Sequence, residues 1–138
     1  MVVPVVESKK FKGRDMKISN INALMYIEIL KEYLDRNDII GYAAARNIRK
    51  LTDATIEYVQ CRDKLIIEFG IPEEDENGNK TGRHVISTKS PNFSDFNSEI
   101  NKFNNIEHDV DIMFVNYSEV IGKLTGSQIL DIDWMLKD

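Results

Sequence analysis

The sequence predicts an α+β fold, a long antiparallel helical hairpin with a small antiparallel β-sheet and short C-terminal helices. Two segments, residues 20–36 and 41–69, repeat apolar residues at helical spacing and contain no proline. Between residues 106 and 115, apolar positions alternate with acids, as they do in a half-buried strand. Asn77-Gly78 is a typical hairpin turn and predicts further antiparallel pairing.

Length and composition are those of one soluble globular domain. The chain has 138 residues, of which 42% are hydrophobic and 30% charged, enough for a core without a disulfide or metal. We expect this domain over residues 16–138. No apolar run reaches membrane-spanning length, and the N-terminal apolar run precedes its basic residues, the reverse of a signal peptide, so we expect a cytoplasmic protein. Cys61 is the single cysteine and is expected to be a reduced, structural thiol.

Residues 1–15 differ from the rest of the chain and are expected to be a peripheral N-terminal extension. Residues 2–6 could add an edge strand, interrupted by Pro4. Residues 12–16 read as the in-frame translation of a purine-rich ribosome-binding site and a start codon. We therefore expect Met16 to be the natural start or an alternative one.

The two long helices are expected to form the hairpin. Ser19 or Asn20 can cap the first, which should run to about Arg36 and is apolar over far more than one stripe. Asn37-Asp38 connects it to the second helix, residues 41–69, so the two should pack antiparallel. The apolar face of the second helix is expected to contain Ala45, Ile48, Thr52, Thr55, Val59, Ile66 and Phe69.

Turn residues divide the remainder into shorter elements. Gly70 and Pro72 end the long helix, residues 71–84 read as an exposed turn, and residues 85–88 as a strand leaving it. A third helix is predicted over residues 93–103 from its phenylalanine spacing. A helical turn at 118–124 and a final helix, capped by Thr125 or Ser127 and running through Leu136, complete the chain. The strand at 106–115 is expected to face the core through Ile106, His108, Val110, Ile112 and Phe114.

The charge distribution argues against broad nucleic-acid binding. The net charge is −5, and because residues 1–15 hold four basic and two acidic residues, the rest of the chain carries −7. Nucleic-acid binding needs clustered Lys and Arg to displace counterions from phosphates. An acidic body instead fits a protein partner with a basic surface, such as a nucleic-acid-binding groove.

Three groups of charged residues are candidate partner-binding sites: the basic cluster Arg46, Arg49 and Lys50, the acidic turn Glu73, Glu74, Asp75 and Glu76, and the acidic strand Glu107, Asp109 and Asp111. The basic cluster could instead pair with Asp53 and Glu57, one turn further on. The acidic strand could be a solvated face, or it could hold a hard metal ion and make the protein a metal-dependent enzyme.

Other patterns argue against catalysis, and we expect no catalytic residue, metal or cofactor. Cys61, His84 and His108 have spacings that make no zinc site. The segment Gly122-Lys123-Leu124-Thr125 lacks the glycine and the Lys-Ser/Thr step of a phosphate-binding loop.

Four sequence blocks resemble a family of short, uncharacterised proteins encoded by phages and prophages of low-GC bacteria. They are MKISN from Met16, GYAAARNIRKL with Arg46 and Arg49, the helix exit into EEDENGN, and the closing LTGSQILDIDWML. The resemblance covers residues 16–138 and implies an accessory protein that acts by binding inside the host bacterial cell.

The resemblance and the acidic charge together lead to a functional hypothesis. We expect a non-enzymatic protein that binds a macromolecular partner and inhibits host defence machinery, as an anti-CRISPR protein does. The alternative is a virion assembly or structural protein, whose apolar first helix packs in a homo-oligomer.

Overall fold

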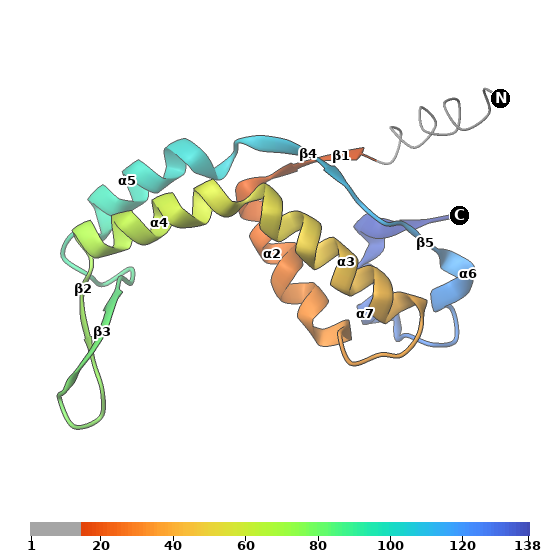
Figure 1. The fold of residues 1–138 in the computed structure, drawn as a ribbon, viewed down its shortest axis with the longest axis horizontal. Coiled ribbons are helices and arrows are strands. Elements are labelled where there is room, and N and C mark those ends of the chain that lie inside the picture. Colours follow the sequence, from red (N-terminus) through yellow and green to blue (C-terminus); the bar gives the residue numbers. More distant parts are fainter. Residues whose placement is uncertain (1–14) are drawn as a thin grey trace. The chain divides into compact units, whose positions relative to one another are not determined.

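The computed structural model describes residues 15–138 (Figure 1). They form two compact units: residues 15–55 with 107–138, called the first unit here, and residues 56–106, called the second unit. Helices are mixed with small antiparallel sheets, which confirms the α+β class. The strand expected at residues 2–6 lies outside the described residues, and the assignment of residues 16–138 to one domain stays a prediction.

The first unit combines short strands with helices from both ends of the chain (Figure 1). Its elements are β1 (Asp15–Ser19), α2 (Asn20–Leu30), the 3₁₀ helix η2 (Lys31–Tyr33), α3 (Ile39–Ala54), β4 (Glu107–Asp111), β5 (Val115–Asn116), α6 (Tyr117–Val120), α7 (Gly126–Asp131), the 3₁₀ helix η3 (Asp133–Met135) and β6 (Leu136–Lys137). β1 pairs antiparallel with β4, and β5 pairs parallel with β6.

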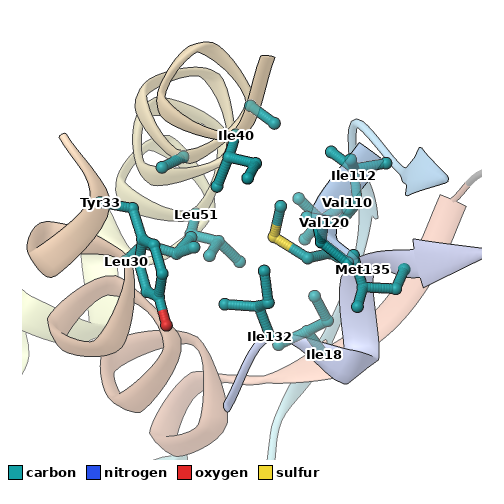
Figure 2. Close-up of a cluster of buried hydrophobic side chains, with 14 of the residues drawn as sticks. Ile18, Leu30, Tyr33, Ile40, Leu51, Val110, Ile112, Val120, Ile132 and Met135 are labelled. Carbon is teal, nitrogen blue, oxygen red and sulfur yellow. The ribbon is translucent and has the colours of Figure 1, made fainter. Parts of the chain in front are cut away.

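The core of the first unit draws on all of these regions (Figure 2). Helices α2 and α3 pack together and supply Leu30, Ile40 and Leu51, while β1 and β4 supply Ile18 and Val110. Ile112, Val120, Ile132 and Met135 come from the segment after β4, and each is at most 1% exposed. Each large aliphatic side chain buried in this way contributes roughly 1.5–3 kcal/mol, so the C-terminal segment is integral to the unit.

The predicted long helix is interrupted, and the long helical hairpin is not confirmed. Helix α3 ends at Ala54 and α4 (Ile56–Phe69) begins after Thr55, whose φ of −111° and ψ of 12° are not helical. The buried Thr55 hydroxyl donates to the carbonyl of Leu51 at 2.9 Å, and the Thr55 N–H bonds the carbonyl of Thr52 instead. A threonine hydroxyl that bonds the carbonyl four residues earlier disturbs a helix, and the sequence pattern did not reveal this.

The buried face of α3 also differs from the prediction. Ala45 and Thr52, expected on the apolar face, are exposed. The buried residues are Ile40, Gly41, Ala43, Ala44, Asn47 and Leu51. The polar Asn47 can lie on this face because its amide is hydrogen-bonded, as described below.

Several element boundaries differ from expectation. Ser19, one of the two candidate caps, caps α2 with its hydroxyl accepting from the N–H of Asn22, but the α-helix ends at Leu30 rather than near Arg36. Thr125, rather than the alternative Ser127, caps α7 and forms a capping box. The final helix nevertheless stops at Asp131, because the chain turns through η3 into β6, where Leu136 pairs with Val115.

The second unit contains α4, the antiparallel hairpin β2 (Ile71–Glu74) and β3 (Lys80–Val85), and α5 (Phe93–Asn104), which packs on α4 (Figure 1). The turn at Asn77-Gly78 is confirmed, and Gly78 has the left-handed φ of 79° that such turns require. The helix predicted from phenylalanine spacing is confirmed as α5. The exposed turn expected over residues 71–84 is instead the hairpin itself, and the strand expected at 85–88 coincides with β3 only at Val85.

The strand predicted at residues 106–115 is shorter, and its pattern is confirmed in part. Val110 and Ile112 are buried and Phe114 is half-buried, but Ile106 is 47% exposed. Ile106 precedes β4 and is therefore not part of the β1–β4 ladder, in which alternate side chains face the core.

Candidate functional site

The acidic strand forms one side of the β1–β4 ladder. In β4, Glu107, Asp109 and Asp111 are exposed, whereas Val110 is buried and His108 half-buried. Successive side chains of a strand point to opposite faces, so the three carboxylates share the outward face. This confirms that the acids face solvent, although it does not test what they bind.

Strand β1 completes this outward face. Asp15 lies opposite Asp111, Lys17 opposite Asp109, and Ser19 opposite Glu107. Lys17 Nζ lies 3.3 Å from Asp109 Oδ1, and both side chains are more than 60% exposed. We call the set Asp15, Lys17, Glu107, Asp109 and Asp111 the acidic face.

Helix α3 joins the acidic face through an ion pair. Arg46 Nη2 lies 3.5 Å from Asp111 Oδ2, with side-chain exposures of 36% and 50%. Two of the predicted groups, the basic cluster and the acidic strand, are thus in contact. Counting Arg46, the face carries four acidic and two basic residues, a net charge of −2.

The basic cluster was alternatively expected to pair with Asp53 and Glu57. For Arg46 that expectation is wrong. Its partner is Asp111, which the fold brings from β4. Within residues 15–138, neither Arg49 nor Lys50 lies within 4.0 Å of a carboxylate. Arg49 is exposed whereas Arg46 and Lys50 are half-buried, so Arg49 is the most accessible cation of this cluster.

The acidic turn belongs to the second unit, and half of it is engaged locally. Asp75 Oδ1 accepts from the N–H groups of Asn77 and Asn79, both at 2.9 Å, and therefore stabilises the turn between β2 and β3. Glu73 accepts from the hydroxyl of Thr81 at 3.0 Å. Glu74 and Glu76 are exposed, and their side chains form no hydrogen bond with another described residue.

His108 turns away from the acids that flank it in sequence. Its Nε2 lies 2.8 Å from Oδ1 of the buried Asn20, on the inward side of the ladder. Among residues 15–138 there is no group of three or more His, Cys, Asp or Glu side chains arranged to hold a metal ion. The acidic face therefore consists of a row of carboxylates that does not include the imidazole of His108.

Asp15 and Lys17 belong to the acidic face although neither was predicted as a site residue, and Asp15 was expected to belong to the N-terminal extension. The alternation of Met16 and Ile18 with Lys17 and Ser19 is a weak strand signal that could have indicated β1. The pairing with β4 could not be read, because the two strands are separated by most of the chain.

Comparison of the chain with protein-family models, curated proteins and solved structures returned no match. None of the helices in residues 15–138 is long and apolar enough to cross a membrane.

Proposed function

We propose that the protein is a non-enzymatic accessory protein of a phage or prophage, which binds a basic surface of a host defence protein through its acidic face. The observation that carries this proposal is the row of Glu107, Asp109 and Asp111 on one side of a two-stranded ladder. Rows of exposed charge steer association with an oppositely charged surface and give it specificity.

The spacing of the row suits a nucleic-acid-binding groove. Alternate residues of an antiparallel strand are about 6.8 Å apart, twice the roughly 3.4 Å axial spacing of phosphates in one DNA strand. Because phosphates follow a helical path around this axis, neighbouring phosphates of one strand lie further apart than the axial spacing, and a row of carboxylates can face successive cations of such a groove.

The ion pairs within the acidic face are weak enough for cations of a partner protein to replace them. Surface pairs such as Lys17–Asp109 and Arg46–Asp111 contribute about 0–1 kcal/mol, so exchanging Lys17 or Arg46 for a cation of the partner costs little. Glu107 is exposed and forms no ion pair with another described residue.

Affinity capture of the tagged full chain from phage-infected cells tests the proposal. We expect the wild type to return a host nucleic-acid-binding complex, with one-to-one binding that weakens as salt is raised. The double variant Glu107→Lys with Asp109→Lys should lose this complex. Its matched control is Asp35→Lys with Glu68→Lys, which changes the net charge equally at two exposed acids outside the candidate groups.

Equal loss of binding in both double variants would indicate a net-charge effect and contradict the acidic face as the site. A self-assembled ring in place of a one-to-one complex would refute charge mimicry.

Assembly in the virion is the second candidate, and α2 provides a specific observation for it. Ile21 and Met25, one helical turn apart, are 47% and 50% exposed. Two adjacent exposed apolar side chains can pack in a homo-oligomer. In this case capture should return phage structural proteins, and Met25→Lys should shift the sedimentation coefficient of the purified protein towards that of a monomer.

A further inference from the structure

The second unit contains a pocket of about 380 Å³ between the last turns of α4 and strand β3. Arg62 and Asp63 line it from α4, beside two isoleucines of the same helix, and Gly82, Arg83 and His84 line it from β3. A volume of this size lies within the range of roughly 300–1,000 Å³ typical of small-molecule sites.

Two arginines, Arg62 and Arg83, line this pocket in an acidic part of the chain. Residues 56–106 contain nine acidic and six basic residues. Asp63 is nevertheless the single carboxylate lining the pocket, against Arg62 and Arg83. The local charge is therefore opposite in sign to that of the unit that carries it.

The two arginines retain unused donors. Arg62 Nη2 lies 3.8 Å from Asp63 Oδ1, beyond hydrogen-bond distance, and Arg62 Nε is buried without a hydrogen-bond partner among the described residues. Within the described part of the chain, Arg83 also has no carboxylate within 4.0 Å. Because guanidinium donors match the oxygens of phosphate in a two-point geometry, such groups suit an oxyanion.

Gly82 keeps the β3 side of the pocket open. Its φ is +87°, a conformation that other residues rarely adopt, and a Cβ built there would meet no atom within 4 Å. Glycine at such a position lets a ligand approach the backbone closely. The neighbouring Ile66 and Ile67 offer apolar surface to the organic part of a ligand.

We propose that this pocket binds the phosphate group of a small phosphorylated molecule, with Arg62 and Arg83 donating to the phosphate oxygens and His84 adjacent to them. A phosphate is favoured over a carboxylate because two guanidinium groups match its greater negative charge. The site lies outside the acidic face and does not depend on the proposed function.

Nuclear magnetic resonance of the ¹⁵N-labelled full chain tests the proposal, with inorganic phosphate, adenosine monophosphate and acetate each titrated at constant ionic strength. We expect saturable changes in the amide signals of residues 62–67 and 82–84 with phosphate and with adenosine monophosphate. Arg83→Gln should weaken phosphate binding about tenfold or more, since it removes charge-assisted hydrogen bonds.

Lys80→Gln is the matched control, because it removes the same charge from an exposed position of the same strand outside the pocket, and it should leave the dissociation constant within a factor of about two. Arg83 is itself exposed, so its variant should keep the wild-type spectrum away from the pocket. Shifts no larger than those of sodium chloride, an unchanged affinity in Arg83→Gln, or acetate binding as tightly as phosphate would each overturn the proposal.

Discussion

The side chain of Asn47 satisfies both backbone polar groups of Met113. The N–H of Met113 donates to Asn47 Oδ1 at 2.8 Å, and Asn47 Nδ2 donates to the carbonyl of Met113 at 3.1 Å. Asn47 is fully buried on α3, and Met113 lies between β4 and β5. The amide thus replaces the strand partner that Met113 lacks, and it ties the C-terminal segment to α3.

Replacing Asn47 should therefore cost stability. Asn47→Ala leaves the N–H and carbonyl of Met113 without partners, and at about 1–3 kcal/mol for each group we expect a loss of roughly 2–6 kcal/mol. Urea denaturation measures it, with Gln60→Ala as an exposed control expected to change stability by less than about 0.5 kcal/mol. A similarly small effect for Asn47→Ala would show that the pair is not stabilising.

Asp38 should make stability depend on pH. Arg36 donates to its carboxylate, with Nη2 2.6 Å from Oδ2, and Asp38 Oδ1 accepts from the N–H of Gly41 as the cap of α3. The hydrogen bonds from Arg36, and secondarily the one from Gly41, hold the pKa of Asp38 below its usual 3.8. Because the folded-state pKa is the lower one, the stabilisation is present above pH 3.8 and is lost as pH falls through the folded-state value.

Asp38→Asn keeps a neutral cap and removes the ion pair. The wild type should be more stable than this variant at pH 7, and the difference should shrink below pH 3.8 as Asp38 takes up its proton. Thermal unfolding across this pH range measures the difference. A difference that stays constant down to pH 2 would contradict the assigned role of the carboxylate.

Substitution by alanine should have different effects on stability at two glycines that lie in helices. A Cβ at Gly41 would lie 2.1 Å from the carbonyl oxygen of Arg36, whereas one at Gly126 would meet no atom within 4 Å. Gly41→Ala should therefore destabilise by about 1–3 kcal/mol despite the better helix propensity of alanine. Gly126→Ala should be neutral or stabilise by up to about 1 kcal/mol. Melting temperatures compare the two, and a stabilised Gly41→Ala would contradict the close approach.

The ion pair of Arg46 with Asp111 should contribute little to the stability of the fold. Any effect of Arg46 on partner binding can therefore be measured separately from its effect on stability. A double-mutant cycle with Arg46→Ala and Asp111→Ala should give a coupling of about 0.2–1 kcal/mol that diminishes with salt. If Arg46→Glu or Arg49→Glu changes stability by only a few tenths of a kcal/mol yet abolishes partner capture, the residue contacts the partner. A coupling well above 2 kcal/mol would instead make the pair structural.

Of the candidate sites, the outward direction of Glu107, Asp109 and Asp111 could be predicted from the sequence, because the two-residue period of a strand is a local property. The partner of Arg46 could not be predicted, since Asp111 reaches it through pairing of distant segments. The pocket lined by Arg62 and Arg83 could not be predicted from the sequence for the same reason. Arg62 lies on a helix and Arg83 on a strand, and nothing in their spacing shows that they line one pocket.

What the sequence determined by itself is the set of short-range features. The positions of two helix caps, each narrowed to two candidate residues, the turn at Asn77-Gly78 and the helix from Phe93 follow from hydrogen bonds and side-chain spacing within a few residues. The break at Thr55 also rests on local hydrogen bonds, to Leu51 and Thr52, but the spacing of apolar residues does not reveal them. Tertiary structure decided the rest: the end of the final helix at Asp131, the burial of Asn47, and the pairing of β1 with β4. A polar residue is buried, or a helix ends, according to what packs against it and which backbone groups need a partner there, and for Asn47 and Leu136 these partners come from other segments of the chain.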